Sequence, residues 1–269
     1  MFSKGRSYIC CWWVGGLLGL GLVLGAQASL DDPDPLRYPA WFVHPPSSAG
    51  GHWAIGYART HATWRTSVAE ARADAYTRLR RRWGLHISGE RLYETVPGHP
   101  MAFRGARQDA MPLRDTLRAV TYVDSARVGT LTLILAHAPE PDATEGTLPS
   151  VEAPPRSFAE DAPPWVDREQ PLSANTVRAV GIAPRYYYSA SSWRLAERHA
   201  RWELAVRAEA QIDRLRNTDS RGQHTMTRVS VDVEMRRVQV IARWQNADAC
   251  YVLMEAKVRS RVSSRTSSR

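Results

Sequence analysis

The sequence predicts an α+β protein made of two copies of one module, each with a strand, one long helix and two further strands. A set of matched residues returns in the same order in both halves of the chain, as expected for a repeated unit. Apolar residues at every third or fourth position predict one long helix per copy. Alternating apolar and polar residues at 229–234 predict a strand with one buried face. A helix packed on an antiparallel sheet satisfies this order of elements.

The two copies share a Pro-x-Trp start, a strand that ends on Gly between small or apolar residues, a Trp-Arg pair and a helical Ala-Arg segment. These features stand at 39–41, 54–58, 64–65 and 71–74 in the first copy, and at 163–165, 179–183, 193–194 and 200–203 in the second. The matches predict the core tryptophans of each module: Trp41, Trp64, Trp165 and Trp193.

The chain divides into five predicted segments. They are a signal peptide at 1–28, a first module at 38–138, a linker at 139–162, a second module at 163–258 and a disordered basic tail at 259–269. The linker holds five prolines and six acidic residues against one arginine. Such a stretch buries too little apolar surface to offset the entropy of ordering it, so we expect each module to have its own core.

In the first module we expect a strand at 53–58 before the helix and strands at 119–128 and 130–136 after it. The segment 67–70 could form a capping box if the helix begins there. One helical face is predicted to consist of Trp64, Val68, Ala71, Ala75, Leu79 and Trp83.

In the second module we expect a strand at 178–183 before the helix and strands at 229–244 and 250–258 after it. Ser191 or Ser192 is available as the N-cap of this helix. Its buried face is predicted to consist of Trp193, Ala196, Ala200, Leu204, Ala208, Ile212 and Leu215.

The N-terminal segment has the features of a secretory signal. Lys4 and Arg6 precede an uncharged run at 10–25, and Ala26-Gln27-Ala28 supplies a cleavage pattern before Ser29. An uncleaved membrane anchor is the alternative, because the apolar run is close to the length of a membrane helix. We therefore expect a periplasmic or outer-membrane-associated protein.

Cleavage at this point would leave Cys250 as the single cysteine. Its surroundings, Ala-Cys-Tyr-Val-Leu, predict a strand and hence a buried thiol. The chain carries 36 basic and 27 acidic residues, a net charge of +9. This excess is compatible with a soluble arginine-rich surface or with an anionic partner.

Several of these motifs resemble the LPP-twenty lipoprotein family of bacterial envelope proteins. The resemblance lies in Pro-x-Trp, the Gly-containing strand end, Ala-Glu-x-x-Ala-Arg-x-Glu-Leu-Ala at 196–205 and Tyr-Val-Leu at 251–253. It implies a dodecin-like helix-on-sheet fold, related to the N-terminal domain of flagellar assembly protein T, without known catalytic residues. The chain differs from the family pattern in having two modules and no lipobox cysteine.

No nucleophile elbow, phosphate loop, zincin motif or Cys-x-x-Cys is present, so we expect neither an enzyme nor a cofactor or metal site. His199 and Glu203 are one helical turn apart, but a metal needs three or four convergent ligands. Tyr186, Tyr187 and Tyr188 stand in the predicted loop before the second helix. Three consecutive aromatic residues there cannot all face inward, and exposed tyrosine is enriched at interfaces; covering of the sheet edge is the alternative.

These features predict a non-enzymatic cell-envelope protein that acts through protein–protein contacts, with surface or flagellar assemblies as its candidate surroundings. The alternative is a module that binds a polyanion such as peptidoglycan, an anionic lipid or a polysaccharide. Nucleic acid is not an expected partner, and oligomerisation is left open. The candidate interaction residues are Tyr186, Tyr187, Tyr188, Arg259, Arg261, Arg265 and Arg269.

Overall fold

The computed structural model describes residues 37–46, 51–95, 102–112, 117, 119–140, 156–168, 175–219 and 222–258. All of them belong to one compact unit, Pro35–Arg269. The predicted signal peptide and the predicted tail, with Arg259, Arg261, Arg265 and Arg269, lie outside the described residues.

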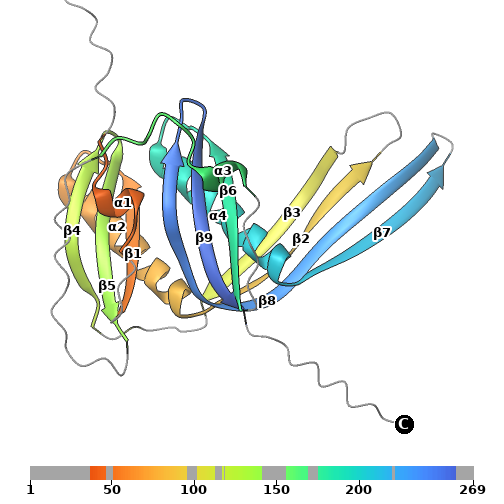
Figure 1. Ribbon diagram of the computed structural model, residues 1–269, viewed down its shortest axis with the longest axis horizontal. Helices are drawn as coiled ribbons and strands as arrows, with labels where there is room; N and C mark the ends of the chain where they lie inside the picture. The colour runs from red at the N-terminus through yellow and green to blue at the C-terminus, as the bar shows by residue number, and fades with distance from the viewer. Residues whose placement is uncertain are drawn as a thin grey trace, which may run out of the picture. The chain divides into compact units, whose positions relative to one another are not determined.

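The predicted α+β class is confirmed: two antiparallel sheets are present, and a 20-residue helix packs on strands in each module (Figure 1). The first module contains α1 (Ala40–Val43), β1 (Gly51–Arg59), α2 (Trp64–Trp83), β2 (Leu85–Thr95), β3 (Ala102–Pro112), β4 (Thr121–Val128) and β5 (Leu131–Pro139). The second contains α3 (Pro164–Asp167), β6 (Thr176–Pro184), α4 (Ser189–Ala208), β7 (Ala210–Asp219), β8 (Gly222–Gln245) and β9 (Ala249–Val258).

One sheet has the strand order β1-β5-β4, and the other has the order β3-β2-β8-β9-β6, with β7 also paired to β8. The 24-residue β8 is the central strand of the larger sheet. Its first part pairs with β2 and β7, and its second part pairs with β9. Figure 1 shows β3, β2, β8 and β7 running side by side.

Each module has strands that the expected order strand, helix, strand, strand does not contain. After the helix, the chain first forms a hairpin, β2 with β3 or β7 with β8, before the last antiparallel pair. The prediction that the second helix continues to Leu215 is wrong. Helix α4 ends at Ala208, and Ile212 and Leu215 belong to β7, opposite Val229 and Met226 of β8.

The predicted linker suggests that the two modules pack separately. In the structure they pack against each other. Strand β2 of the first module pairs with β8 of the second over its whole length. The larger core cluster also spans both modules: the Trp193 ring lies 5.3 Å from that of Phe42 and 5.9 Å from that of Phe158, between ring centroids. The modules therefore share one core.

The C-terminal end of the predicted linker belongs to this core. Arg156 and Tyr38 exchange backbone hydrogen bonds of 2.7 and 2.8 Å. Phe158 packs against the core cluster, and the Ala159 carbonyl accepts a hydrogen bond from Trp244 Nε1 at 2.8 Å. The Tyr38 and Phe158 rings are in contact at a centroid distance of 4.9 Å, with their planes tilted by 52°. Through these contacts the end of the predicted linker packs on the core, although the composition of residues 139–162 does not suggest it.

The strand and the helix of each module approach each other closely at one glycine. A Cβ on Gly56 would overlap backbone atoms of Ala71 and Ala75, and a Cβ on Gly181 would overlap backbone atoms of Ala196 and Ala200.

These contacts give the true correspondence between the modules. It aligns Val68, and not Trp64, with Trp193, so the match of the Trp-Arg pairs was wrong by one helical turn. Accordingly Trp193 is fully buried, whereas Trp64 is 47% exposed.

A further repeat lies in the loop before each helix. Ser67 Oγ accepts a hydrogen bond from the His61 amide, and Ser192 Oγ accepts one from the Tyr186 amide. Neither serine is an N-cap: Thr63 caps α2 through its side chain, and Tyr188 occupies the N-cap position of α4. The serine side chains instead tie the preceding loop to the first turn of the helix.

Gly181→Ala is expected to destabilise the protein by about 1 to 3 kcal/mol or more, because the added methyl overlaps backbone that cannot rotate away. Urea unfolding of the full chain measures the change. Ile182→Ala, at the neighbouring, 49% exposed position, is the control and should change the free energy of unfolding by less than about 1 kcal/mol. Equal effects for the two variants would contradict the proposed close contact.

Candidate functional site

The three predicted interface tyrosines are all exposed. The exposed fractions of Tyr186, Tyr187 and Tyr188 are 48%, 83% and 40%. The Tyr187 and Tyr188 rings meet edge to face at 4.9 Å, and the Arg59 guanidinium lies 5.0 Å from the centre of the Tyr188 ring. We call Tyr186, Tyr187 and Tyr188 the tyrosine surface.

Hydrogen bonds hold the chain next to the tyrosine surface. The Arg185 amide donates to the Asp248 carbonyl at 2.9 Å, and Arg185 Nη1 donates to the Asn246 carbonyl at 3.2 Å. Together with the bond from the Tyr186 amide to Ser192 Oγ, they fix both ends of the turn that leads into α4. The exposed rings therefore project from an ordered backbone.

The other sequence-predicted positions are structural. Trp41 and Trp193 are core residues as predicted, Trp165 is partly exposed, and the prediction for Trp64 is wrong. Cys250 is buried, and burial raises the pKa of its thiol to about 12.

His199 and Glu203, which are one helical turn apart on α4, contact different groups. His199 Nδ1 lies 2.6 Å from the Ile182 carbonyl oxygen, whereas Glu203 pairs with Arg91. Within the part of the chain that the structure describes, no group of three or more His, Cys, Asp or Glu side chains could hold a metal.

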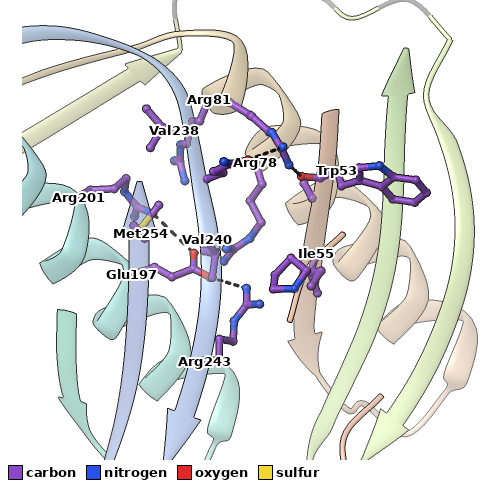
Figure 2. A pocket seen from close by; sticks show the side chains of 14 residues that line it. Trp53, Ile55, Arg78, Arg81, Glu197, Arg201, Val238, Val240, Arg243 and Met254 are labelled. Atoms are coloured by element: carbon purple, nitrogen blue, oxygen red, sulfur yellow. Dashed lines mark hydrogen bonds and ion pairs between the residues drawn. The ribbon is translucent and has the colours of Figure 1, made fainter. Parts of the chain in front are cut away.

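A buried charge cluster lies where α2, α4, β1 and β8 meet (Figure 2). Its centre is Glu197 of α4, which is 1% exposed. Glu197 Oε1 accepts hydrogen bonds from Tyr57 Oη at 2.7 Å and from Arg243 Nη2 at 3.0 Å. Glu197 Oε2 pairs with Arg78 and lies 3.7 Å from Arg201 Nη1. One carboxylate thus contacts three guanidinium groups from three different elements.

Part of the cluster closes the free edge of β1. Asp74 Oδ2 accepts a hydrogen bond from the Tyr57 amide at 2.9 Å, and Arg194 donates to the Tyr57 carbonyl at 2.6 Å. Arg82 donates to the Trp53 carbonyl. Charged side chains in place of a further strand satisfy the edge and prevent pairing with another chain.

A cavity of about 50 Å³ opens within this cluster. We call it the arginine cavity. Its cationic lining consists of Arg78, Arg81, Arg82, Arg201 and Arg243. Glu197 is the one acidic residue of the lining, and the rest consists of Gln239 and apolar side chains such as Trp53, Ile55 and Met254 (Figure 2).

Burial dominates the electrostatics of the arginine cavity. Desolvation lowers the pKa of Arg82 to about 10, with Arg237 adding to the shift and Glu140 and Glu255 opposing it. Desolvation also lowers the pKa of Arg201 to about 10, with Glu197 opposing the shift and Arg81 and Arg78 adding to it. Burial alone would raise the pKa of Glu197, but Arg78, Arg243, Arg201 and the Tyr57 hydroxyl lower it to about 2. The cluster therefore keeps Glu197 ionised. Asp74 and Glu197 raise the pKa of Arg78 against the effect of burial, whereas desolvation lowers the pKa of Arg81, Arg82 and Arg201.

The cluster was not predicted from the sequence. Glu197 and Arg201 lie within the 196–205 segment that carries the family resemblance, but as an i, i+4 pair they look like a solvated helix face. Arg78 and Arg243 are distant from both along the chain. The repeated Gly-to-Ala contacts place α2 and α4 on their strands, and they are the signal that could have indicated a buried junction.

Comparison of the chain with protein-family models, curated proteins and solved structures gave no match. The resemblance to the LPP-twenty family therefore stays a prediction. In the ranges that the structure describes, none of the helices combines the length and apolar character needed to span a bilayer.

Proposed function

We propose that this chain is a non-enzymatic cell-envelope protein that binds a protein partner through the tyrosine surface. The observation that carries the proposal is the exposure of three consecutive tyrosines on a fixed backbone. Tyrosine offers a large apolar ring with a polar tip, and the ring loses little entropy on binding because it has few rotatable bonds. An ordered loop also lowers the cost of binding.

The charges beside the tyrosine surface favour an acidic partner. Arg59 stacks on Tyr188, and Arg185 is tied to the same turn. Basic residues around an aromatic centre select a partner with complementary charge and speed its encounter. Export to the envelope rests on the predicted signal peptide, and a place near surface or flagellar assemblies rests on the family resemblance.

Tyr187→Ala should weaken partner binding by about tenfold or more, the usual effect of removing a central interface aromatic. A photo-crosslinking amino acid at position 187, introduced in the cells that produce the protein, should give one discrete adduct. The same group at Ala69, an exposed position of α2, is the control and should not. The partner identified from the adduct, once purified, provides the affinity measurement for Tyr187→Ala.

Salt separates this proposal from the polyanion alternative. An interface built on packed aromatic rings should survive high ionic strength, whereas binding through Arg259, Arg261, Arg265 and Arg269 should weaken steeply as the charges are screened. An adduct that forms equally at positions 69 and 187, or an affinity for the purified partner that is lost at high salt, would count against the tyrosine surface.

A further inference from the structure

We propose that the arginine cavity binds a compact oxyanion, the phosphate or carboxylate group of a small solute. This site is separate from the tyrosine surface and does not depend on the function proposed above. The proposal starts from the imbalance of charge in the lining, where five guanidinium groups face one carboxylate.

The carboxylate is already fully engaged. Glu197 contacts Arg78, Arg201, Arg243 and the Tyr57 hydroxyl, so its acceptor sites are occupied by the cluster itself. Asp74, outside the lining, is bound to Arg78 and to the Tyr57 amide. These two acidic residues cannot also balance the remaining arginines.

Arg81 and Arg82 are the two cations left over. Arg82 donates to the Trp53 carbonyl and to Gln239, which are neutral acceptors. Within the described residues, neither Arg81 nor Arg82 forms an ion pair with a carboxylate. Glu140 and Glu255 raise the pKa of Arg82 without a direct ion pair, and they are themselves paired with Arg237 and Arg178. A buried guanidinium without a paired carboxylate is costly, and a bound anion would reduce that cost.

Unused hydrogen-bond donors point in the same direction. The buried Nε atoms of Arg81, Arg82, Arg201 and Arg243 have no acceptor among the described residues. All four residues line the same cavity. Arginine presents its N–H groups as a fixed fork that matches the oxygens of a carboxylate or a phosphate. The four donors therefore provide recognition as well as charge.

The size of the cavity decides what can occupy it. At about 50 Å³ it exceeds the roughly 10 to 15 Å³ that one water molecule needs. Water could satisfy the donors, but it would not balance the charge, whereas an oxyanion does both. The apolar wall and the small volume exclude a polymer segment, so this ligand differs from the polyanion considered above.

Isothermal titration of the full chain with inorganic phosphate and, separately, with propionate tests the site at constant ionic strength set with sodium chloride. At least one of the two should bind saturably with a stoichiometry near one. Phosphate binding indicates an inorganic or phosphate-ester ligand, and propionate binding indicates a small organic acid. Absence of binding by both would overturn the proposal.

Arg201→Met should weaken the binding by about tenfold or more, because a hydrogen bond to a charged group is lost. Arg198→Met, an exposed position on the same helix, changes the net charge equally and should leave the affinity unchanged. Arg81→Met, with Arg65→Met as its control on α2, repeats the comparison if Arg201→Met does not fold. An equal loss of affinity in the exposed-site variants would show that only general charge attraction is at work and would overturn the site.

Discussion

A fragment of residues 163–258 is expected to fail to fold cooperatively, although its sequence contains a complete repeat. Alone, it loses the β2 partner of β8 and the rings of Phe42 and Phe158 that pack on Trp193. Removing the side chain of a buried Trp usually costs about 3 to 5 kcal/mol. Removing the residues that pack on Trp193 eliminates many of the same contacts. A domain of this size is stable by only about 5 to 15 kcal/mol, so these losses together approach its whole stability.

Near-ultraviolet circular dichroism and urea titration of the fragment provide the measurement. The full chain should show a sharp transition, and the fragment should show none or a broad one at low urea. A fragment of residues 35–258, which keeps both modules, is the control and should unfold like the full chain. Cooperative unfolding of the 163–258 fragment at the midpoint of the full chain would show that the shared core is dispensable.

Glu197→Gln is expected to lower the free energy of unfolding by about 3 to 5 kcal/mol, the usual result of removing one member of a buried ion pair. The amide cannot balance Arg78, Arg201 and Arg243, which would remain buried around it. Glu203→Gln on the same helix is the matched control. Its ion pair with Arg91 is partly exposed, so the change should stay below about 1 kcal/mol.

The pH dependence of unfolding gives a second test of Glu197. Because its pKa is lowered to about 2 from an ordinary value of 4.5, the ionised form stabilises the folded state. That contribution is complete above about pH 4.5 and is lost as the pH falls through about 2. The unfolding free energies of wild type and Glu197→Gln should therefore converge in acid. A constant difference across this range would contradict the assigned ion pairs.

The local pattern of the sequence predicted the elements that are set by nearby residues. The three- and four-residue spacing identifies both long helices, and alternation identifies the central part of β8. The sequence pattern predicts too late an end for α4, because Ile212 and Leu215 continue the helical spacing by coincidence. Pairing with β8, distant in sequence, decides in favour of a strand there.

The buried charge cluster between the modules consists of residues that differ between the two copies of the repeat. In the register set by Gly56 and Gly181, Glu197 of the second helix corresponds to Arg72 of the first. The charge cluster therefore belongs to the contact between the modules. The sequence of neither module alone contains a repeated pattern that indicates it. The tyrosine surface was predicted because consecutive aromatic residues in a loop can be recognised locally.

The unbroken β8 strand has a mechanical consequence. Pairing of β8 with β2 ends at Met235, where pairing with β9 begins. The register with β9 then shifts between Arg236 and Gln239, with Arg237 at a positive φ of 51°. The backbone nevertheless continues through this bend as one covalent strand. A load applied to the hairpin strands is therefore transmitted directly to the sheet beneath α4, and amide hydrogen exchange in the two parts should be correlated rather than independent.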